Sequence, residues 1–404
     1  MRRRLNPVAM SRQHFTVIGM TDDRSVWFPP EVQAVISTGR VFSGGKRHHE
    51  IVAPLLPEGA VWIDITVPLE AVFDRYAGHA EVVVFASGDP LFFGFANTLR
   101  RELPDAEITV FPSFNSLQLL AHRILLPYAD MRTVSLTGRP WEAFDEALIR
   151  GERLIGVLTD RQKTPALIAR RMLDYGYDNY QMTVGECLGN RDAERVRTLS
   201  LAEATAVEFA FPNCLILAQT VAKVHPFGLP EQDFALLDGR VNMITKMPIR
   251  LLTLSQLDLA GRRSFWDIGF CTGSVSIEAR LRFPQLQLTA FEIREAGREL
   301  MAQNARKFGA PGIDVHIGDF LEADLSALPA PDAVFIGGHG GRLGDFLQRI
   351  DGVLLPGGRI VFNAVSEQSQ ALFRAAVAAV GRRITNEMHV SVDSFNPINI
   401  MTAE

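Results

Sequence analysis

The sequence has few cysteines and no long apolar run. Its three cysteines, Cys187, Cys214 and Cys271, are odd in number and far apart, so they predict neither a disulfide framework nor a CxxC or Cys/His zinc cluster. We therefore expect a protein of the reducing cytoplasm. No apolar stretch approaches the roughly 18 residues that a membrane-spanning helix needs, so we expect a soluble protein without a membrane partner.

An excess of positive charge is also missing. The chain has 41 Lys and Arg against 46 Asp and Glu, a formal net charge of -5. Because general attraction to nucleic acid depends on an excess of basic side chains, we expect no nucleic-acid partner. Residues 1–13 include Arg2, Arg3 and Arg4 but no apolar segment after them, so we expect a tail outside the fold and no secretory signal.

The apolar residues that are present suffice for two hydrophobic cores. With 404 residues, 47% of them hydrophobic, the chain predicts two domains of about 100–200 residues each. The best boundary lies at 222–231, where an apolar run gives way to His225-Pro-Phe-Gly-Leu-Pro230, which is rich in helix- and strand-breaking residues. We therefore expect one domain over residues 14–222 and a second over 231–404.

Short β-branched runs alternate with helix-length segments in both halves, which is an α/β pattern. In the first half such runs include 16–18, 82–85, 108–111 and 154–158. In the second half they are 265–268, 288–291, 315–317, 333–336 and 359–362. The second set predicts a doubly wound parallel sheet. Two last strands, 385–392 and 398–401, are joined by a turn too short for a crossover helix, so we expect an antiparallel hairpin there.

A glycine-rich turn follows the first strand of the second half, where open α/β sheets bind ligands. Gly269 and Gly273 are its first and fifth residues, whereas a dinucleotide fingerprint needs glycine at positions one, three and six. This spacing, with Asp267 two residues before the first glycine, resembles the S-adenosylmethionine (SAM) loop of class I methyltransferases. The middle glycine of that family is Cys271 here, and we interpret Cys271 as a small loop residue and not as a nucleophile.

Two helices are predicted around this turn. Residues 275–283 alternate apolar and polar as a strand would, but a strand there would leave no crossover between parallel strands, so we predict a helix. A second helix is predicted from Ala296 to Phe308, ending at Gly309.

Two further acids stand at strand ends in the second half. Glu292 ends the second strand nineteen residues after Gly273, where a carboxylate can accept both hydroxyls of an adenosine ribose. Asp319 follows the third strand and is a candidate for the adenine edge. Taken singly, these acids and Asp267 could be ordinary solvated residues at strand ends. Together, at these spacings, they favour SAM binding by Asp267, Gly269, Cys271, Gly273, Glu292 and Asp319.

In the first half, an apolar strand is followed by Gly88-Asp89-Pro90. One interpretation is purely structural, with Asp89 as the N-cap and Pro90 as the first residue of a helix. The segment also resembles the signature of the tetrapyrrole methylases, SAM-dependent enzymes of a different α/β fold. Further matching segments, in order, are 44–47, 112–116, 158–160 and 164–165. The resemblance covers most of residues 14–220 and implies that Gly88, Asp89 and Pro90 bind SAM, with Asp89 also a catalytic candidate. It departs at 19–24, which replaces the usual glycine-rich turn.

The order of the two halves is similar to the decarboxylating precorrin C5,15-methyltransferases of cobalamin biosynthesis. Segment 245–250 at the start of the second half and segment 335–341 at its fourth strand belong to this resemblance, which covers nearly the whole chain. It implies that the first domain methylates carbon 5 of a precorrin-6 type tetrapyrrole. The second would methylate carbon 15 and decarboxylate the ring C acetate. It also implies SAM as cofactor and a homo-oligomer.

The expected chemistry needs no nucleophilic side chain, because an electron-rich ring carbon can attack the methyl group of SAM when both are held in line. Decarboxylation requires an oriented acetate and control of a proton. His339, between two glycine pairs at a strand end, is the candidate catalytic residue for it. No metal is expected, because the adjacent His48 and His49 point in different directions on a helix or strand.

The many carboxylates of such a substrate predict contacts with basic side chains. The candidates are Lys246, Arg250 and Arg342 in the second half and Lys46, Arg47, His48 and Arg139 in the first. For Lys246 and Arg250 the alternative is a solvated helix face, and exposed basic residues are common in general.

Three other functions stay open. The two SAM domains could methylate a different precorrin or another small molecule. One half could have lost catalysis and serve only in binding or assembly. A nicotinamide oxidoreductase is a third possibility, against which the glycine spacing counts.

Overall fold

The computed structural model describes residues 12–393 and 396–404, so the basic residues Arg2, Arg3 and Arg4 lie outside the described part. By the density of internal contacts the chain divides into two units. The first unit comprises residues up to 139, 154–168 and 181–218, and the second comprises 140–153, 169–180 and 219–404. The expected domain boundary at 222–231 stays a prediction.

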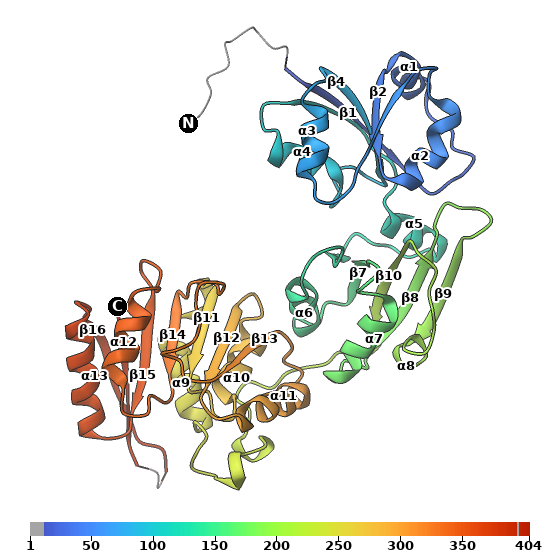
Figure 1. Ribbon diagram of the computed structural model, residues 1–404. Coiled ribbons are helices and arrows are strands. Elements are labelled where there is room, and N and C mark those ends of the chain that lie inside the picture. Colours follow the sequence, from blue (N-terminus) through green and yellow to red (C-terminus); the bar gives the residue numbers. More distant parts are fainter. Residues whose placement is uncertain (1–11, 394–395) are drawn as a thin grey trace, which may run out of the picture. The chain divides into compact units, whose positions relative to one another are not determined.

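Two five-stranded sheets form most of the first unit (Figure 1). The first sheet is parallel, with the order β3-β2-β4-β1-β5. Its strands are β1 (His14–Met20), β2 (Val41–Gly44), β3 (Val61–Asp64), β4 (Glu81–Ser87) and β5 (Glu107–Phe111). The second sheet is mixed, with the order β6-β7-β10-β8-β9. Its strands are β6 (Arg132–Ser135), β7 (Leu154–Leu158), β8 (Tyr180–Glu186), β9 (Arg195–Ser200) and β10 (Asn213–Gln219). The four runs predicted in the first half lie within β1, β4, β5 and β7.

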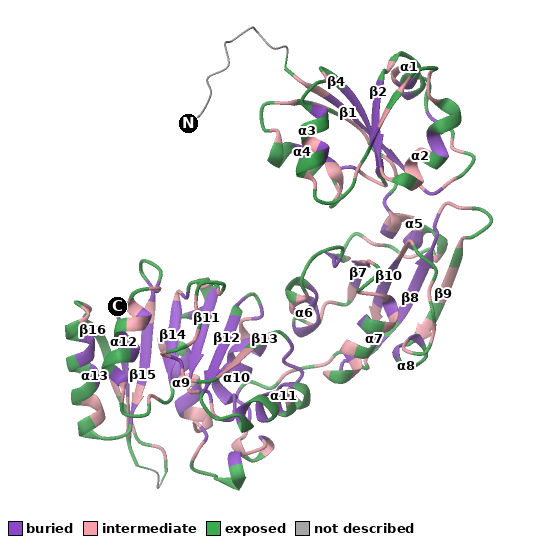
Figure 2. Cartoon of the chain, in the orientation of Figure 1, coloured by how far each residue is buried: buried purple, intermediate pink, exposed green. Residues whose placement is uncertain are grey.

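Helices cover both faces of the first sheet. The helices before residue 222 are α1 (Pro30–Thr38), α2 (Lys46–Val52), α3 (Glu70–Tyr76), α4 (Phe95–Glu102), α5 (Ser116–Arg123), α6 (Glu142–Ile149), α7 (Pro165–Asp174) and α8 (Leu201–Ala204). Val82 and Val84 of β4 pack in one hydrophobic cluster with residues of α3 and α4. Phe85, which points to the other face, packs with residues of α1 and α2. A strand buried on both faces shows the continuous apolar pattern seen in β4, and Figure 2 colours it as buried.

The prediction that Asp89 and Pro90 start a helix is wrong, because α4 begins at Phe95. The Asp89 carboxylate instead accepts the backbone N–H of Leu91 at 2.8 Å and closes a turn. Phe93 then adopts a φ of 54°, which cannot continue into a right-handed helix. Asp89-Pro90 therefore shapes a loop between β4 and α4.

The second unit is built on a seven-stranded sheet with the order β13-β12-β11-β14-β15-β17-β16. Its strands are β11 (Ser264–Ile268), β12 (Gln287–Glu292), β13 (Ile313–Ile317), β14 (Ala333–Ile336), β15 (Arg359–Ala364), β16 (Ile384–Val390) and β17 (Ile398–Ala403). The first five strands in this order are parallel, and β17 pairs antiparallel with both β15 and β16. The doubly wound sheet and its terminal hairpin are therefore confirmed, although residues 394–395 between the hairpin strands lie outside the described residues.

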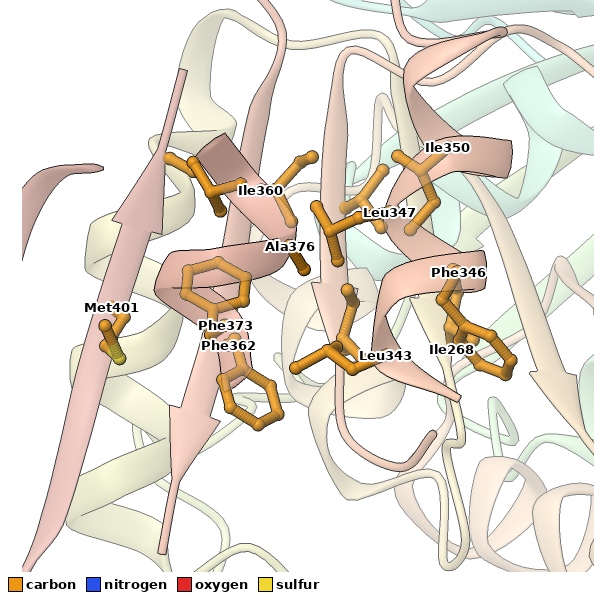
Figure 3. Close-up of a cluster of buried hydrophobic side chains, with 14 of the residues drawn as sticks. Ile268, Leu343, Phe346, Leu347, Ile350, Ile360, Phe362, Phe373, Ala376 and Met401 are labelled. Atoms are coloured by element: carbon orange, nitrogen blue, oxygen red, sulfur yellow. The ribbon is translucent and has the colours of Figure 1, made fainter. Parts of the chain in front are cut away.

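Helices also lie on both faces of this sheet. They are α9 (Met247–Leu257), α10 (Ser274–Arg282), α11 (Ala296–Phe308), α12 (Leu343–Asp351) and α13 (Glu367–Ala379). Figure 3 shows side chains of α12 and α13, such as Leu347 and Phe373, in one hydrophobic cluster with Phe362 of β15, whose ring stacks on Phe373. On the opposite face, Thr253 of α9 hydrogen-bonds to Asn363, the next residue of β15.

The two helices predicted beside the glycine turn are confirmed. Residues 274–281 of α10 are all buried, which explains why their apolar pattern did not distinguish a helix from a strand. Helix α11 ends at Gly309, whose φ of 71° closes the helix in the left-handed region. Among the described residues, no helix has the length and apolar character needed to cross a membrane.

Candidate active sites

A cavity of about 510 Å³ lies beyond the carboxyl ends of β11, β12 and β14 in the second unit. Strand order reverses at β11, which is the usual ligand position in an open α/β sheet. The predicted residues that line the cavity are Asp267, Gly269, Cys271, Glu292, Asp319, His339, Arg342 and Lys246. Gly273 lies behind the lining, at the start of α10, where a Cβ would come within 2.4 Å of the Met301 sulfur. The structure thus brings together side chains that are up to about a hundred positions apart in the sequence.

The turn after β11 depends on the backbone freedom of Gly269. Its φ is 78°, and a Cβ there would lie 2.6 Å from the backbone nitrogen of Gly338. The loops after β11 and β14 therefore touch through glycine backbones. Cys271 also has a positive φ, 52°, which is uncommon for a residue with a side chain. Its thiol donates to the carbonyl of Met243 at 3.1 Å, a contact that a glycine could not make.

Glu292 is fixed at the end of β12 by backbone donors. One carboxylate oxygen accepts the N–H of Cys271 at 2.9 Å, and the other accepts the N–H of Arg294 at 3.0 Å. The side chain is 3% exposed yet borders the cavity. Arg294 Nη1 also lies 3.3 Å from Oε1, so Oε1 already accepts two hydrogen bonds and Oε2 keeps one lone pair for a ligand. The Arg294 side chain is 48% exposed, so a ligand hydroxyl can replace it at Oε1.

Asp267 is buried beneath the glycine turn. Its Oδ2 accepts the backbone N–H of Ser276 at 3.1 Å and the Ser276 hydroxyl at 2.5 Å, while no hydrogen-bond partner of Oδ1 is found among the described residues. Burial raises the pKa of Asp267 to about 7, and the hydrogen bonds from Ser276 only partly offset this effect. The Asp267 side chain thus links the end of β11 to the first turn of α10 through Ser276.

The raised pKa of Asp267 gives a testable pH dependence. The pKa of Asp267 is higher in the folded protein than its unfolded value of about 3.9. The contribution of Asp267 to the unfolding free energy is therefore fully present below about pH 3.9 and is lost as pH rises through about 7. Between about pH 5 and about pH 8, we expect the unfolding free energy of the wild type to fall by roughly 3 kcal/mol relative to Asp267→Asn. Denaturant unfolding of both proteins across this range measures the difference, and parallel curves would contradict the assignment.

Two further predicted residues are paired with each other at the cavity. Arg342 Nη1 lies 2.8 Å from Asp319 Oδ2, and this hydrogen bond lowers the pKa of Asp319. His339 is half-buried against Phe362, with ring centroids 5.7 Å apart, and burial lowers its pKa. Its Nδ1 accepts the N–H of Gly341 at 3.2 Å, so the neutral ring carries its proton on Nε2.

The prediction that Arg250 contacts substrate is corrected by its burial. The side chain is fully buried, and its Nε lies 3.2 Å from Glu278 Oε2. The guanidinium also donates to the carbonyls of Thr245 and Leu229. Arg250 is therefore neither part of the cavity lining nor on a solvated helix face, because α9 turns it toward α10. Lys246, at the N-cap of α9, does border the cavity.

A stability measurement tests this structural role of Arg250. Removing one partner of a buried ion pair costs about 3–5 kcal/mol, so we expect Arg250→Met to lower the unfolding free energy by that amount. We expect the KM for the substrate to stay at the wild-type value. Lys246→Met is the matched comparison, with the reverse result: unchanged stability and a raised KM. A large KM increase in Arg250→Met with unchanged stability would instead support the predicted contact between Arg250 and the substrate.

The first unit has its own cavity, of about 630 Å³, beyond the carboxyl ends of β1, β2 and β4. Lys46, Arg47, His48 and Gly88, four of the residues predicted to contact substrate or SAM, line it. Asp89 and Pro90 are not part of the lining. The prediction that Asp89 is catalytic is therefore corrected, because its side chain lies outside the lining and closes the turn to Leu91. Pro90 packs beside Gly19, since a Cβ on Gly19 would lie 3.0 Å from the Pro90 ring. Pro90 and Gly19 therefore lie in the wall behind the residues that line the cavity.

Aromatic side chains form a rim around this cavity, and no spacing in the sequence marks them. Phe93, Phe114 and Phe211 are 39%, 54% and 42% exposed and all line the cavity. The guanidinium of Arg161, also in the lining, stacks on Phe211 at 4.5 Å. Arg139 stacks on Phe93 at 4.8 Å from just outside the lining. The rim thus combines flat apolar surfaces with positive charge.

The histidine pair in this unit has two separate roles. His48 faces the cavity and hydrogen-bonds to Ser87 at 2.9 Å, while His49 stacks on Trp62 with ring centroids 4.2 Å apart. Within the described part of the chain, no three His, Cys, Asp or Glu side chains form a group that could hold a metal ion.

Comparison with known proteins finds matches to both halves. Residues 30–205 match the family model described as tetrapyrrole (corrin/porphyrin) methylases, and residues 238–403 match a precorrin methyltransferase domain. Over 96% of its length the chain is 35% identical to a precorrin-6Y C(5,15)-methyltransferase [decarboxylating] of a Sinorhizobium species, covering 92% of that protein.

Two shorter relatives from Salmonella typhimurium match parts of the chain. A cobalt-precorrin-6B C(15)-methyltransferase (decarboxylating) is 35% identical over 167 residues, 41% of this chain and 85% of the relative. A cobalt-precorrin-7 C(5)-methyltransferase is 26% identical over 193 residues, 47% of this chain and 92% of the relative.

Proposed function

This chain belongs to the decarboxylating precorrin-6Y C5,15-methyltransferases of cobalamin biosynthesis and methylates a precorrin with SAM as donor, and we propose that each of its two cavities catalyses a different methylation. The first cavity serves carbon 5, and the second serves carbon 15 and the decarboxylation of the ring C acetate. The two shorter relatives support this division, since their aligned stretches of 167 and 193 residues are each comparable in length to one of the two matched ranges. Domains over 14–222 and 231–404 are supported by matched ranges that end at 205 and restart at 238.

In the second site, the residues around the glycine turn fit SAM. Glu292 keeps free acceptor capacity for the ribose hydroxyls, Asp319 is placed for the adenine edge, and Gly269 and Cys271 give the ligand a close backbone surface. When bound, SAM supplies a methyl group on a positively charged sulfur, which an electron-rich ring carbon attacks directly. The protein therefore needs to hold ligand and ring carbon in line, and no side-chain nucleophile is required.

His339 is the proposed catalytic residue for decarboxylation. Because Nδ1 is engaged by Gly341, the Nε2–H is the group free to hydrogen-bond to the acetate carboxylate. Loss of carbon dioxide leaves an electron pair that the conjugated ring absorbs. The Nε2–H orients the departing carboxylate, and the proton that replaces it on carbon comes from solvent. Lys246 and Arg342 are proposed to bind other carboxylates of the substrate, with Arg342 exchanging its partner Asp319 for one of them.

In the first site, we assign the aromatic rim and its arginines to the macrocycle. Phe93, Phe114 and Phe211 offer flat surfaces for a conjugated ring, and Lys46, Arg47 and Arg161 offer positive charge for peripheral carboxylates. Gly88 borders the same space and is the part of Gly88-Asp89-Pro90 that we propose to touch SAM. The cytoplasm is the proposed location, consistent with three free cysteines, and a homo-oligomer remains a proposal from resemblance.

The observation that carries this proposal is the presence of two separate cavities, one in each unit. Each cavity is lined mainly by residues of one of the two ranges that match a methyltransferase family. Mass spectrometry of the full chain incubated with precorrin-6Y and SAM tests it. The expected product carries two added methyl groups and has lost one carbon dioxide. A product with a single methyl group at saturating SAM would contradict the proposal.

A further inference from the structure

Ser87, the last residue of β4, has a hydroxyl that is approached by two donors. Arg47 Nη2 lies 2.9 Å from Ser87 Oγ, and His48 Nε2 lies at the same distance from it. Ser87 is exposed at the edge of the first cavity, and all three side chains line that cavity. The direction of these two hydrogen bonds decides what the Ser87 hydroxyl can do.

Both hydrogen bonds end on the Ser87 oxygen. A guanidinium has only donors, so Arg47 donates. His48 Nδ1 accepts the backbone N–H of Gly45 at 3.2 Å, which leaves the proton of the neutral ring on Nε2 and makes that nitrogen a donor as well. Burial, aided by the charge of Arg47, lowers the pKa of His48 to about 4, consistent with a neutral ring near pH 7.

The Ser87 hydroxyl hydrogen is consequently left to donate elsewhere. An alcohol oxygen accepts at two lone pairs, and both are used by Arg47 and His48. No further hydrogen bond of the Ser87 hydroxyl is found within residues 12–393 and 396–404. The hydrogen is therefore available to a bound molecule in the cavity.

The charge around Ser87 indicates which acceptor fits. Lys46 and Arg47 both line the cavity, and Arg47 itself contacts the Ser87 oxygen. Asp22 Oδ1 lies 3.4 Å from Arg47 Nε and 3.9 Å from Arg24 Nη2, and Arg24 also pairs with Glu50, so three basic side chains face two carboxylates. One net positive charge therefore remains in the region of the free hydroxyl hydrogen. A carboxylate satisfies both, because it accepts the hydrogen bond and carries the opposite charge.

We propose that Ser87 is a specificity-determining residue of the first site that donates its hydroxyl hydrogen to a carboxylate of the bound reactants. This inference rests on the proposed carbon 5 site. Arg47 and His48 act as positioning residues, because they fix the orientation of the Ser87 hydroxyl. The carboxylate comes either from the precorrin periphery or from the amino-acid part of SAM.

Three variants of the full chain test this role of Ser87. Ser87→Ala removes the donor, Ser87→Thr keeps it, and Ser37→Ala removes an exposed hydroxyl on α1 that donates locally to Ala34. Carbon 5 methylation gives KM and kcat, and calorimetry with S-adenosylhomocysteine gives the affinity of the donor site. Losing a hydrogen bond to a charged group corresponds to about a 10- to 100-fold effect on binding.

A 10- to 100-fold rise of the precorrin KM in Ser87→Ala alone assigns the carboxylate to the substrate, and an equal loss of S-adenosylhomocysteine affinity assigns it to the donor. In both cases Ser87→Thr should stay within about threefold of wild type, as should Ser37→Ala. Unchanged constants in Ser87→Ala, or equal losses in Ser87→Ala and Ser87→Thr, would overturn the inference. If Gly19→Ala, which forces apart the backbone of β1 and the loops that border the first site, left carbon 5 methylation intact, the site assignment itself would fail.

Discussion

Glu292→Ala is expected to eliminate methylation of carbon 15 while leaving the carbon 5 site functional. The substitution removes an acceptor for two ribose hydroxyls, and hydrogen bonds to a charged group are worth about 1.5–3 kcal/mol each. Binding of S-adenosylhomocysteine to the second site should therefore weaken about 100-fold or more. Mass spectrometry of the product and calorimetry of the full chain measure the two effects.

The matched control for Glu292→Ala is Glu295→Ala. Glu295 lies three residues further along, is 81% exposed and pairs only with Arg298 among the ion pairs found in the described chain. We expect it to behave as wild type in both assays. Retention of carbon 15 methylation in Glu292→Ala, with wild-type S-adenosylhomocysteine affinity at both sites, would show that the ribose assignment is wrong.

Gly19→Ala is expected to have the opposite effect, with loss of carbon 5 methylation and retention of the second site. A Cβ on Gly19 would lie 2.2 Å from the carbonyl oxygen of Gly88 and 2.8 Å from the backbone nitrogen of Ser113. Both are backbone atoms, so no side-chain rotation relieves the clash, and β1 must move relative to the loops after β4 and β5. We expect a loss of about 3 kcal/mol or more in unfolding free energy together with loss of carbon 5 methylation.

Gly78→Ala is the matched control for Gly19→Ala, because a Cβ at Gly78 meets nothing within 4 Å. It should leave both stability and methylation unchanged. Mixing Gly19→Ala with Glu292→Ala should restore both methylations, because each variant retains the site that the other lacks. Wild-type carbon 5 methylation by Gly19→Ala alone would contradict the placement of that reaction in the first cavity.

The sequence predicted the second unit well, because parallel strands buried on both faces have continuous apolar patterns bounded by turns. Helix α11 was predicted to the residue, since Gly309 supplies a left-handed C-cap. The sequence also predicted that Asp267, Glu292 and Asp319 lie close together, because each lies at or near the end of a strand in one sheet. Strand ends in a parallel sheet converge, so sequence spacing carries spatial information there.

The remaining errors come from partners far away in the sequence in two cases, and from an unrecognised local turn in the third. Arg250 has the spacing of an exposed helical residue, but its burial depends on Glu278 in the next helix. Asp89 precedes a proline as an N-cap would, yet its carboxylate closes a local turn. The rim of Phe93, Phe114 and Phe211 comes from three loops, and among 26 phenylalanines no periodicity distinguishes these from core residues.

Calorimetric titration of the full chain with S-adenosylhomocysteine tests the central claim most directly. The account predicts two binding sites per chain in the wild type and one in Glu292→Ala, with the remaining site unchanged in affinity. A wild-type stoichiometry of one, or two sites that both persist unaltered in Glu292→Ala, would contradict it.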